Sequence, residues 1–271
     1  NTVSAAKYTG NLTVAVTSAV LDDATMVLTG GTSTSDVLSI TAAAGGGAAT
    51  TTSISDIENI NVVGDAAVFL WTGSDANADD GTTFTVDATS MNSGTYASTI
   101  DMTAEADASV VVKTGAAADT ITISASDLAE SVNSGAGNDN ILFASANLTS
   151  IDVIDGGAGT DSLTISTVSD LSAFSSISRV ADSTSTLAEA VYKLTYSNGD
   201  IISYSNINTL TVGSNAYVNT SPTSTSTMLF RSADQNTGYL FSGTVGSGSL
   251  TGPSSIEISD FSGRTASSTL N

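Results

Sequence analysis

The sequence predicts an all-β fold: a parallel β-solenoid with an additional β module at its C-terminal end. Two observations predict this fold. Short β-rich segments bounded by turn residues recur along the whole chain, and one pattern of turns repeats in its middle part. Helical signals are weak, and the best candidate for a short helix is residues 185–191.

The β-rich segments are bounded by Gly, Asn and Asp, residues that favour turns. Ser and Thr number 44 and 41, and the aromatic fraction is only 6%. Small, hydroxylated and β-branched side chains suit thin β layers better than a thick globular core. Residues 66–71 form the densest apolar stretch, and we expect a buried strand there with Phe69 and Trp71 in the core. The other predicted strands are residues 11–16, 25–28, 37–41, 57–63, 83–86, 109–113, 120–123, 140–143, 150–154, 162–165, 192–196 and 208–212.

Three segments in the middle of the chain superimpose residue by residue, at 114–122, 134–142 and 156–164. Their aspartates are separated by 20 and then 22 positions, and they are Asp119, Asp139 and Asp161. A second element repeats in step with the first, and it consists of Asp127-Leu128, Asn147-Leu148 and Asp170-Leu171. A repeat of about 20 residues matches one coil of a solenoid, with two short strands and two turns.

The repeat divides the chain into three parts. We expect irregular solenoid coils in residues 1–108, regular coils that carry the repeated turns in residues 109–185, and a separate β module in residues 186–271. Two weaker similarities extend beyond the middle part. Residues 30–40 are interpreted as a decayed copy of the repeated turn, and residues 207–212 echo residues 57–62.

Composition and charge exclude several classes of function. The chain has 271 residues, with 27 Asp and Glu against 6 Lys and Arg, and its formal net charge is −21. This charge disfavours nucleic acid and an anionic membrane surface as partners. His and Cys are absent, so the commonest general base, thiol nucleophiles and disulfides are absent too, and we expect no enzymatic activity. No apolar stretch approaches the ~20 residues that a membrane-spanning helix needs, so we expect no membrane insertion.

The repeated turns carry a chemistry that suits a metal ion. The third segment fits the pattern Gly-Gly-x-Gly-x-Asp-x-apolar-x, in which glycines allow tight turns with positive φ and direct carbonyl oxygens inward. Stacked coils lie ~4.8 Å apart, so Asp119, Asp139 and Asp161 would form a column of carboxylates. Like charges at that distance repel unless their pKa values rise or a cation lies between them. Carboxylate and carbonyl oxygens are hard ligands, and they favour Ca²⁺.

These turns resemble the calcium-binding β-roll of RTX proteins, and more broadly the bacterial surface-layer (S-layer) and large adhesin proteins that carry such rolls. The resemblance rests on residues 114–122, 134–142 and 156–164, is supported by residues 57–62 and 85–91, and covers about half of the chain. It implies that loop Asp side chains and loop carbonyls of adjacent coils hold Ca²⁺. The implied ligands are Asp119, Gly135, Gly137, Asp139, Gly157, Gly159 and Asp161.

This chain departs from the family pattern at two of the three turns. Ala117 and Ala118 replace glycine-rich positions in the first turn, and Ser134 replaces a Gly in the second. The pair Asp139 and Asp161 is therefore the stronger expected site. The motif also occurs on one side of each coil only.

The resemblance implies a calcium-stabilised S-layer subunit that is extracellular, lies on a bacterial cell surface and self-associates into a lattice, with cell-surface polysaccharide as a further partner. The alternative is a secreted, calcium-dependent adhesin or glycan-binding module. Its binding surface would use the aromatic residues of the C-terminal part, which are Tyr192, Tyr196, Tyr204, Tyr217, Phe230, Tyr239 and Phe241. A polysaccharide lyase would need grouped cationic side chains, but the six Lys and Arg residues are scattered along the chain.

Turn chemistry offers a simpler explanation for each acidic position taken alone. Gly-Asp turns occur in many β proteins because both residues suit turns. Asp127, Asn147 and Asp170 are interpreted as turn or cap residues rather than ligands. The acidic segments at residues 22–23 and 75–80 are interpreted as solvated loops rather than further cation sites. Only the register of the three repeated turns favours a metal site.

Overall fold

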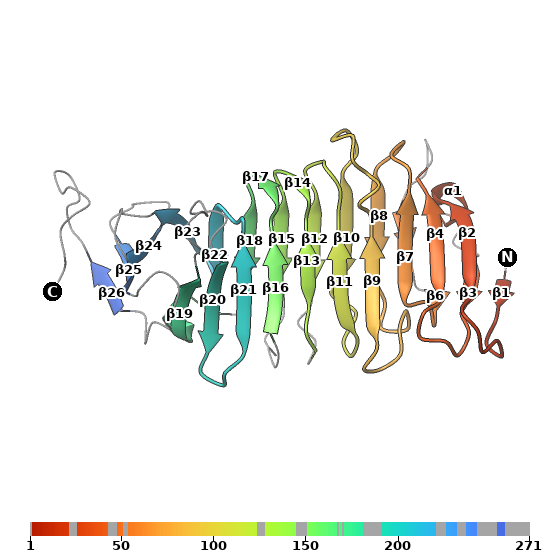
Figure 1. The fold of residues 1–271 in the computed structure, drawn as a ribbon, viewed down its shortest axis with the longest axis horizontal. Helices are drawn as coiled ribbons and strands as arrows, with labels where there is room; N and C mark the ends of the chain where they lie inside the picture. The colour runs from red at the N-terminus through yellow and green to blue at the C-terminus, as the bar shows by residue number, and fades with distance from the viewer. Residues whose placement is uncertain are drawn as a thin grey trace.

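The structure is a computed structural model of the chain. It describes residues 2–21, 26–42, 48–50, 54–123, 128–144, 151–166, 168–169, 171–180, 191–220, 226–231, 237–242 and 254–257. The predicted fold class is confirmed, because the described strands stack as a parallel β-solenoid (Figure 1). The helix predicted at residues 185–191 falls almost entirely outside the described residues, and residue 191 begins a strand.

Two parallel sheets form the two long walls of the solenoid. The strands of the first sheet are β2 (Thr13–Thr17), β4 (Val37–Thr41), β7 (Asn59–Val63), β9 (Thr83–Asp87), β11 (Ser109–Lys113), β13 (Ser131–Asn133), β16 (Ile151–Asp155) and β21 (Ile201–Ser205). The strands of the second sheet are β5 (Ala48–Thr50), β8 (Phe69–Thr72), β10 (Ser98–Met102), β12 (Thr120–Ile123), β15 (Asn140–Phe143), β18 (Ser162–Ile165) and β22 (Thr209–Val212). The chain alternates between the two sheets over most of this length, so each pair of strands makes one coil.

Shorter elements lie at the edges of the coils. A three-stranded parallel sheet near the N-terminus consists of β1 (Thr2–Ser4), β3 (Val27–Thr29) and β6 (Ile54–Ser55). A two-stranded parallel pair in the repeated turns consists of β14 (Ala136–Gly137) and β17 (Ala158–Gly159). The described helices are one turn each, α1 (Ser18–Leu21) and the 3₁₀ helix η1 (Leu171–Ala173). No helix in the described part of the chain is long and apolar enough to span a membrane.

Pairing changes from parallel to antiparallel at the C-terminal end of both sheets. The strands β19 (Phe174–Val180) and β20 (Val191–Tyr196) extend the first sheet beyond β21, which itself pairs in parallel with β16. Four further antiparallel strands extend the second sheet beyond β22, and they are β23 (Asn215–Thr220), β24 (Ser226–Arg231), β25 (Thr237–Ser242) and β26 (Ser254–Glu257). At the predicted boundary between residues 108 and 109, parallel pairing continues on both sides through β9–β11 and β10–β12.

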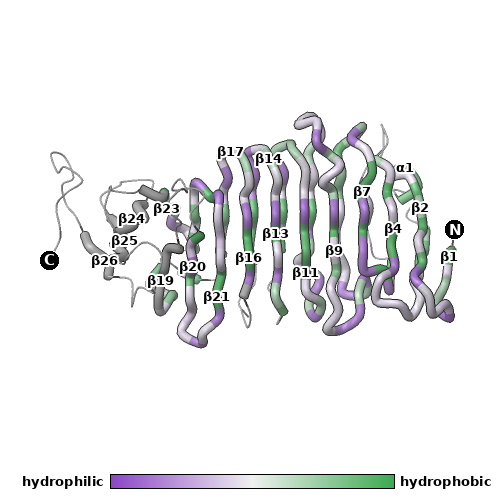
Figure 2. Tube along the Cα trace, viewed as in Figure 1, coloured by the Kyte–Doolittle hydropathy of each residue, from purple (hydrophilic) through white to green (hydrophobic). Residues whose placement is uncertain are grey.

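The core is a set of in-register rows between the two sheets. One row from the second sheet is Trp71, Ile100, Ile121, Ile141, Leu163 and Leu210, and all six side chains are at most 1% exposed. Less buried positions alternate with these buried ones along the strands, as in β12, β15 and β18, and Figure 2 shows hydrophobic and hydrophilic residues interspersed along the described coils. Full burial of such a side chain contributes about 1.5–3 kcal/mol to stability. Because each side chain in a row packs against those of the adjacent coils, each coil is stabilised mainly by its two neighbours.

The aromatic residues of the N-terminal part join the two sheets. Trp71 in β8 stacks on Phe69 in the same strand and on Phe84 in β9, with ring centroids 6.4 and 6.3 Å apart. Phe69 and Trp71 are 3% and 1% exposed, which confirms their predicted place in the core. The strand predicted at residues 66–71 is β8, which begins at Phe69 and ends at Thr72.

Candidate metal centre

The three repeated turns lie directly on top of one another along one edge of the solenoid. The register pairs Thr120 with Asn140 and Asn140 with Ser162, so the aspartate before each of these residues occupies the same position in successive coils. The turns also bond to each other through their backbones. Ala158 donates its N–H to the Gly135 carbonyl oxygen at 2.8 Å, and β14 pairs with β17. Figure 1 shows these two short strands at the edge where the turns stack.

The glycines of the turns are required by this close stacking. Gly135, Gly137, Gly157 and Gly159 all have positive φ, between 71° and 152°. A Cβ atom on Gly159 would lie 1.5 Å from the Gly137 carbonyl oxygen, and one on Gly157 would lie 1.8 Å from that of Gly135. The structure therefore brings all seven predicted residues into one stack of turns.

Each aspartate of the column caps the backbone of the coil before it. The Oδ1 atom of Asp119 accepts the Ser98 N–H at 2.5 Å, that of Asp139 accepts the Asp119 N–H at 2.8 Å, and that of Asp161 accepts the Asp139 N–H at 2.9 Å. The three side chains are 2%, 2% and 1% exposed. Sequence reasoning placed these residues correctly but did not predict the capping bonds.

The second carboxylate oxygen of each aspartate is buried and accepts no well-aligned hydrogen bond from a described residue. These atoms are the Oδ2 atoms of Asp119, Asp139 and Asp161. The Thr114 and Ser134 hydroxyls nevertheless lie close enough to Asp119 and Asp139 to lower the pKa values of these two carboxyls, against the larger effect of burial. A buried carboxylate oxygen without a well-aligned hydrogen bond is costly, because the desolvation of its charge is not compensated. Three such atoms stand at the same position in consecutive coils.

Burial makes the column a poor place for three negative charges. Desolvation raises the pKa of Asp119 to about 6, against the opposing effect of the Ser98 N–H, and the charge of Asp139 adds to the rise. Desolvation also raises the pKa of Asp161 to about 6 and that of Asp139 above its usual value. The column is therefore relieved either by protons or by a cation.

The aspartates of the column offer donor atoms of the kind that calcium prefers. The atoms of the column without a well-aligned hydrogen bond are all carboxylate oxygens, which are hard donors. The Gly115 and Gly135 carbonyls already accept one N–H each from the next coil, so each retains one lone pair. The Oδ2 atoms of Asp119, Asp139 and Asp161 are consequently the atoms that would hold the ion, with loop carbonyls completing the shell.

The segment interpreted as a decayed copy, residues 30–40, does not belong to this column. Asp36 precedes β4 of the first sheet, whereas the column precedes strands of the second sheet. Both oxygens of Asp36 are partnered, by the Leu12 N–H at 2.8 Å and the Gly31 N–H at 2.5 Å. The interpretation as a copy of the same turn is therefore wrong. Similarly, residues 57–62 lead into the first sheet and residues 207–212 into the second.

Sequence reasoning missed a second acidic group. Carboxylate oxygens of Asp75, Glu105 and Asp107 lie within 4.8 Å of one another. Desolvation raises the pKa of Glu105 to about 7, and a hydrogen bond with Asp80 raises that of Asp107. The sequence does not predict a role for Glu105 and Asp107, because neither residue belongs to a repeated segment. The acidic pair at residues 22–23, together with Asp127, Asn147 and Asp170, lies outside the described residues.

The C-terminal aromatic residues that the structure describes are packing residues. Tyr192 and Tyr204 stack with ring centroids 5.2 Å apart, and these two and Tyr217 are each 1% exposed. Tyr196 packs against Phe174 at a centroid distance of 4.5 Å. Tyr192, Tyr204 and Tyr217 are thus buried in the fold, whereas Tyr196 is half-buried. The side chains of the remaining aromatic candidates lie outside the described part, and they are Phe230, Tyr239 and Phe241.

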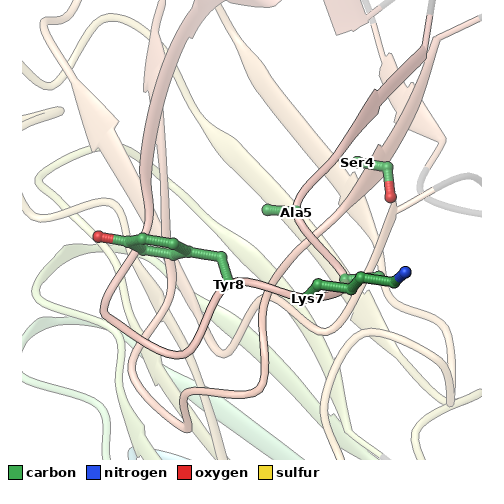
Figure 3. A pocket seen from close by; sticks show the side chains of 5 residues that line it. Ser4, Ala5, Lys7 and Tyr8 are labelled. Atoms are coloured by element: carbon green, nitrogen blue, oxygen red, sulfur yellow. The ribbon is translucent and has the colours of Figure 1, made fainter.

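A depression of ≈ 500 Å³ lies near the N-terminus, and it is lined by Ser4, Ala5, Ala6, Lys7 and Tyr8. All five residues come from one stretch of chain, and Figure 3 shows Lys7 and Tyr8 pointing to opposite sides of it. The depression is open and brings no residues of other coils together, so it offers no built site.

No protein-family model, curated protein or solved structure matches the chain.

Proposed function

We propose that the chain is a calcium-stabilised structural protein of a bacterial cell surface, an S-layer subunit that self-associates into a lattice. One observation carries the proposal: three stacked, buried aspartates each present an oxygen that accepts no well-aligned hydrogen bond from the described residues, and burial raises the pKa of all three. Calcium would supply the positive charge that this column lacks.

The chain's own residues prepare the column for an ion. The hydrogen bonds from backbone N–H groups hold each Oδ1 atom, so the orientation of each carboxylate is fixed before an ion binds. Positive-φ glycines allow the direct backbone contact between adjacent turns, in which Ala136 and Ala158 donate their N–H groups to the Gly115 and Gly135 carbonyl oxygens at 2.8 Å. Binding to the folded state alone stabilises it by about 2.7 kcal/mol when calcium is ~100 times its Kd.

The fold supports a structural role. The coils stack in register along one long axis, and each coil contacts mainly its neighbours (Figure 1). Such a rod offers repeated, regular outer faces along its length. A net charge of −21 disfavours close packing of copies, and divalent cations reduce that repulsion. Calcium would thus favour both the fold of one subunit and the approach of its neighbours.

The lattice is favoured over the adhesin alternative because the described C-terminal tyrosines are packed within the fold. Tyr192, Tyr204 and Tyr217 are nearly inaccessible to a sugar, so the aromatic surface that the alternative needs loses three of its members. Cell-surface polysaccharide remains part of the proposal as a partner that anchors the lattice.

Calorimetric titration with Ca²⁺ and electron microscopy of the same sample test the proposal. We expect saturable binding and ordered two-dimensional sheets that disappear when chelator is added. Identical melting curves with calcium and with chelator would contradict the calcium part. Calcium binding without sheets at any protein concentration would contradict the lattice part.

A further inference from the structure

The chain of capping bonds continues one coil beyond the last aspartate. Asp161 donates its N–H to the Oδ1 atom of Asn208 at 2.7 Å, just as Asp119 and Asp139 donate theirs to the next aspartate. The next residue, Thr209, pairs with Ser162 in the second sheet. Asn208 therefore occupies the fourth position of the column, with an amide in place of a carboxylate.

The amide changes what this position offers to a cation. Because Oδ1 accepts the Asp161 N–H, the other terminal atom of Asn208 is the Nδ2 amide nitrogen. An amide nitrogen donates hydrogen bonds and has no lone pair for a metal. In the three aspartates, the corresponding atom is Oδ2, which accepts no well-aligned hydrogen bond from the described residues. An ion between Asp161 and Asn208 would meet one carboxylate and one N–H dipole of the wrong sign.

The turn that precedes Asn208 also lacks the loop of the earlier coils. Six residues, 156–161, connect β16 to β18, but only three, 206–208, connect β21 to β22. The short turn contains no glycine, and Ile207 is 1% exposed. A Cβ atom on Gly156 would lie 3.0 Å from the Cδ1 atom of Ile207, so this apolar side chain covers the last glycine-rich turn.

The other end of the column is also neutral. Ser98 occupies the position before Asp119 and donates its N–H to that carboxylate at 2.5 Å. Its own side chain carries no charge, and its hydroxyl lies 3.6 Å from the Met91 sulfur. The column thus contains three carboxylates and two intervals between them, closed by Ser98 at one end and by Asn208 at the other.

We propose that Asn208, with Ile207 packed over Gly156, is a terminating cap of the column that ends the series of cation sites at Asp161. This inference rests on the proposed calcium function. The amide keeps the capping bond to Asp161 without adding a fourth negative charge. A carboxylate at this position would extend the repulsion by one coil and increase the dependence of the fold on calcium.

The test compares melting temperatures in calcium and in chelator for the wild type and for Asn208→Asp. The matched control is Asn11→Asp, which adds the same charge at an exposed position whose Oδ1 atom also accepts a hydrogen bond from the next coil, from the Ser33 hydroxyl at 2.7 Å. We expect Asn208→Asp to melt several degrees lower in chelator and to recover most of the loss in calcium. The difference between the two conditions then exceeds that of the wild type, and the control leaves it unchanged.

Two results would overturn the inference while the proposed function stands. One is an equal loss for Asn208→Asp in both conditions, which would make Asn208 a structural acceptor only. The other is no change in either condition. A wild type that melts identically in both conditions would overturn the proposed function and the inference together.

If Asn208→Asp fails to fold in either condition, the double variant Asp161→Asn, Asn208→Asp provides a second test. The double variant has three carboxylates, as the wild type does, at positions 119, 139 and 208. The amide at position 161 separates the last two of them. We expect the double variant to fold in chelator. If the double variant also failed to fold, charge repulsion within the column could not be the cause of the failure of Asn208→Asp.

Discussion

Asp139 accepts the backbone N–H of Asp119 at 2.8 Å through one carboxylate oxygen, while its other oxygen is buried and accepts no well-aligned hydrogen bond from the described residues. The same side chain thus joins two coils and leaves a charge that needs compensation. The two roles can be tested separately. An Asn at position 139 retains the oxygen that accepts the Asp119 N–H but removes the negative charge that would bind an ion.

Asp139→Ala removes the acceptor of a buried N–H and the central carboxylate of the column. We expect it to lower the free energy of unfolding by about 1–3 kcal/mol in chelator. Asp139→Asn keeps the acceptor and removes the buried charge, so we expect it to be at least as stable as the wild type in chelator and to lose the rise in melting temperature that calcium gives the wild type. Scanning calorimetry checks both. Asp101→Asn is the control, since this half-exposed carboxylate on β10 bonds only to Thr103 among the described residues.

Acid should stabilise the calcium-free protein. The pKa values of Asp119 and Asp161 rise from 3.8 to about 6, and that of Glu105 rises from 4.5 to about 7. The folded state then binds more protons than the unfolded state between these values, so the stability that these groups contribute is lost as pH rises from about 4 to about 7. Urea unfolding in chelator across this range checks the direction. A free energy of unfolding that increases with pH there would show that the carboxylates are not strained by burial.

Gly159→Ala should be far more harmful than a change at an open glycine. Its Cβ would lie 1.5 Å from the Gly137 carbonyl oxygen, so the turns must move apart. We expect a cost above the ~1–2 kcal/mol of a left-handed backbone alone, together with weaker calcium binding. Gly64→Ala is the matched control, because Gly64 has φ +83° and nothing within 4 Å of the added atom. Equal losses in the two variants would contradict close stacking of the turns.

Ile141→Ala tests the packing of the coils. Ile141 is fully buried in the row between Ile121 and Leu163, so we expect a loss of about 2–5 kcal/mol. Leu142→Ala on the outer face of the same strand should cost much less. Chemical denaturation measures both. A larger loss at Leu142 would mean that the strand faces the other way.

The sequence predicted the solenoid because its strands and turns repeat locally. The alternation at residues 120–123, 140–143 and 162–165 places Ile121, Ile141 and Leu163 inward, and the structure confirms these strands. Strands with few apolar residues were missed, such as β13 with Ser131, Val132 and Asn133. Their place is set by pairing with β11 and β16, and a single sequence does not reveal that pairing.

The candidate site was predictable only where it repeats. Asp119, Asp139 and Asp161 share a spacing and a glycine-rich context, but Asn208 lies 47 residues beyond Asp161 and follows a turn without glycine. The antiparallel strands β19 and β20 lie between them in sequence and interrupt the period. Residues 30–40 were wrongly interpreted as a copy of the repeated turn because they share its Gly pair and Asp. The same residue types also suit the turn that leads into the other sheet.

Anomalous diffraction from crystals grown in calcium would locate the ions directly. We expect peaks beside the Oδ2 atoms of Asp119, Asp139 and Asp161, in the intervals between them, and no peak between Asp161 and Asn208. Turns that remain without an anomalous peak at saturating calcium would contradict a metal role for these aspartates.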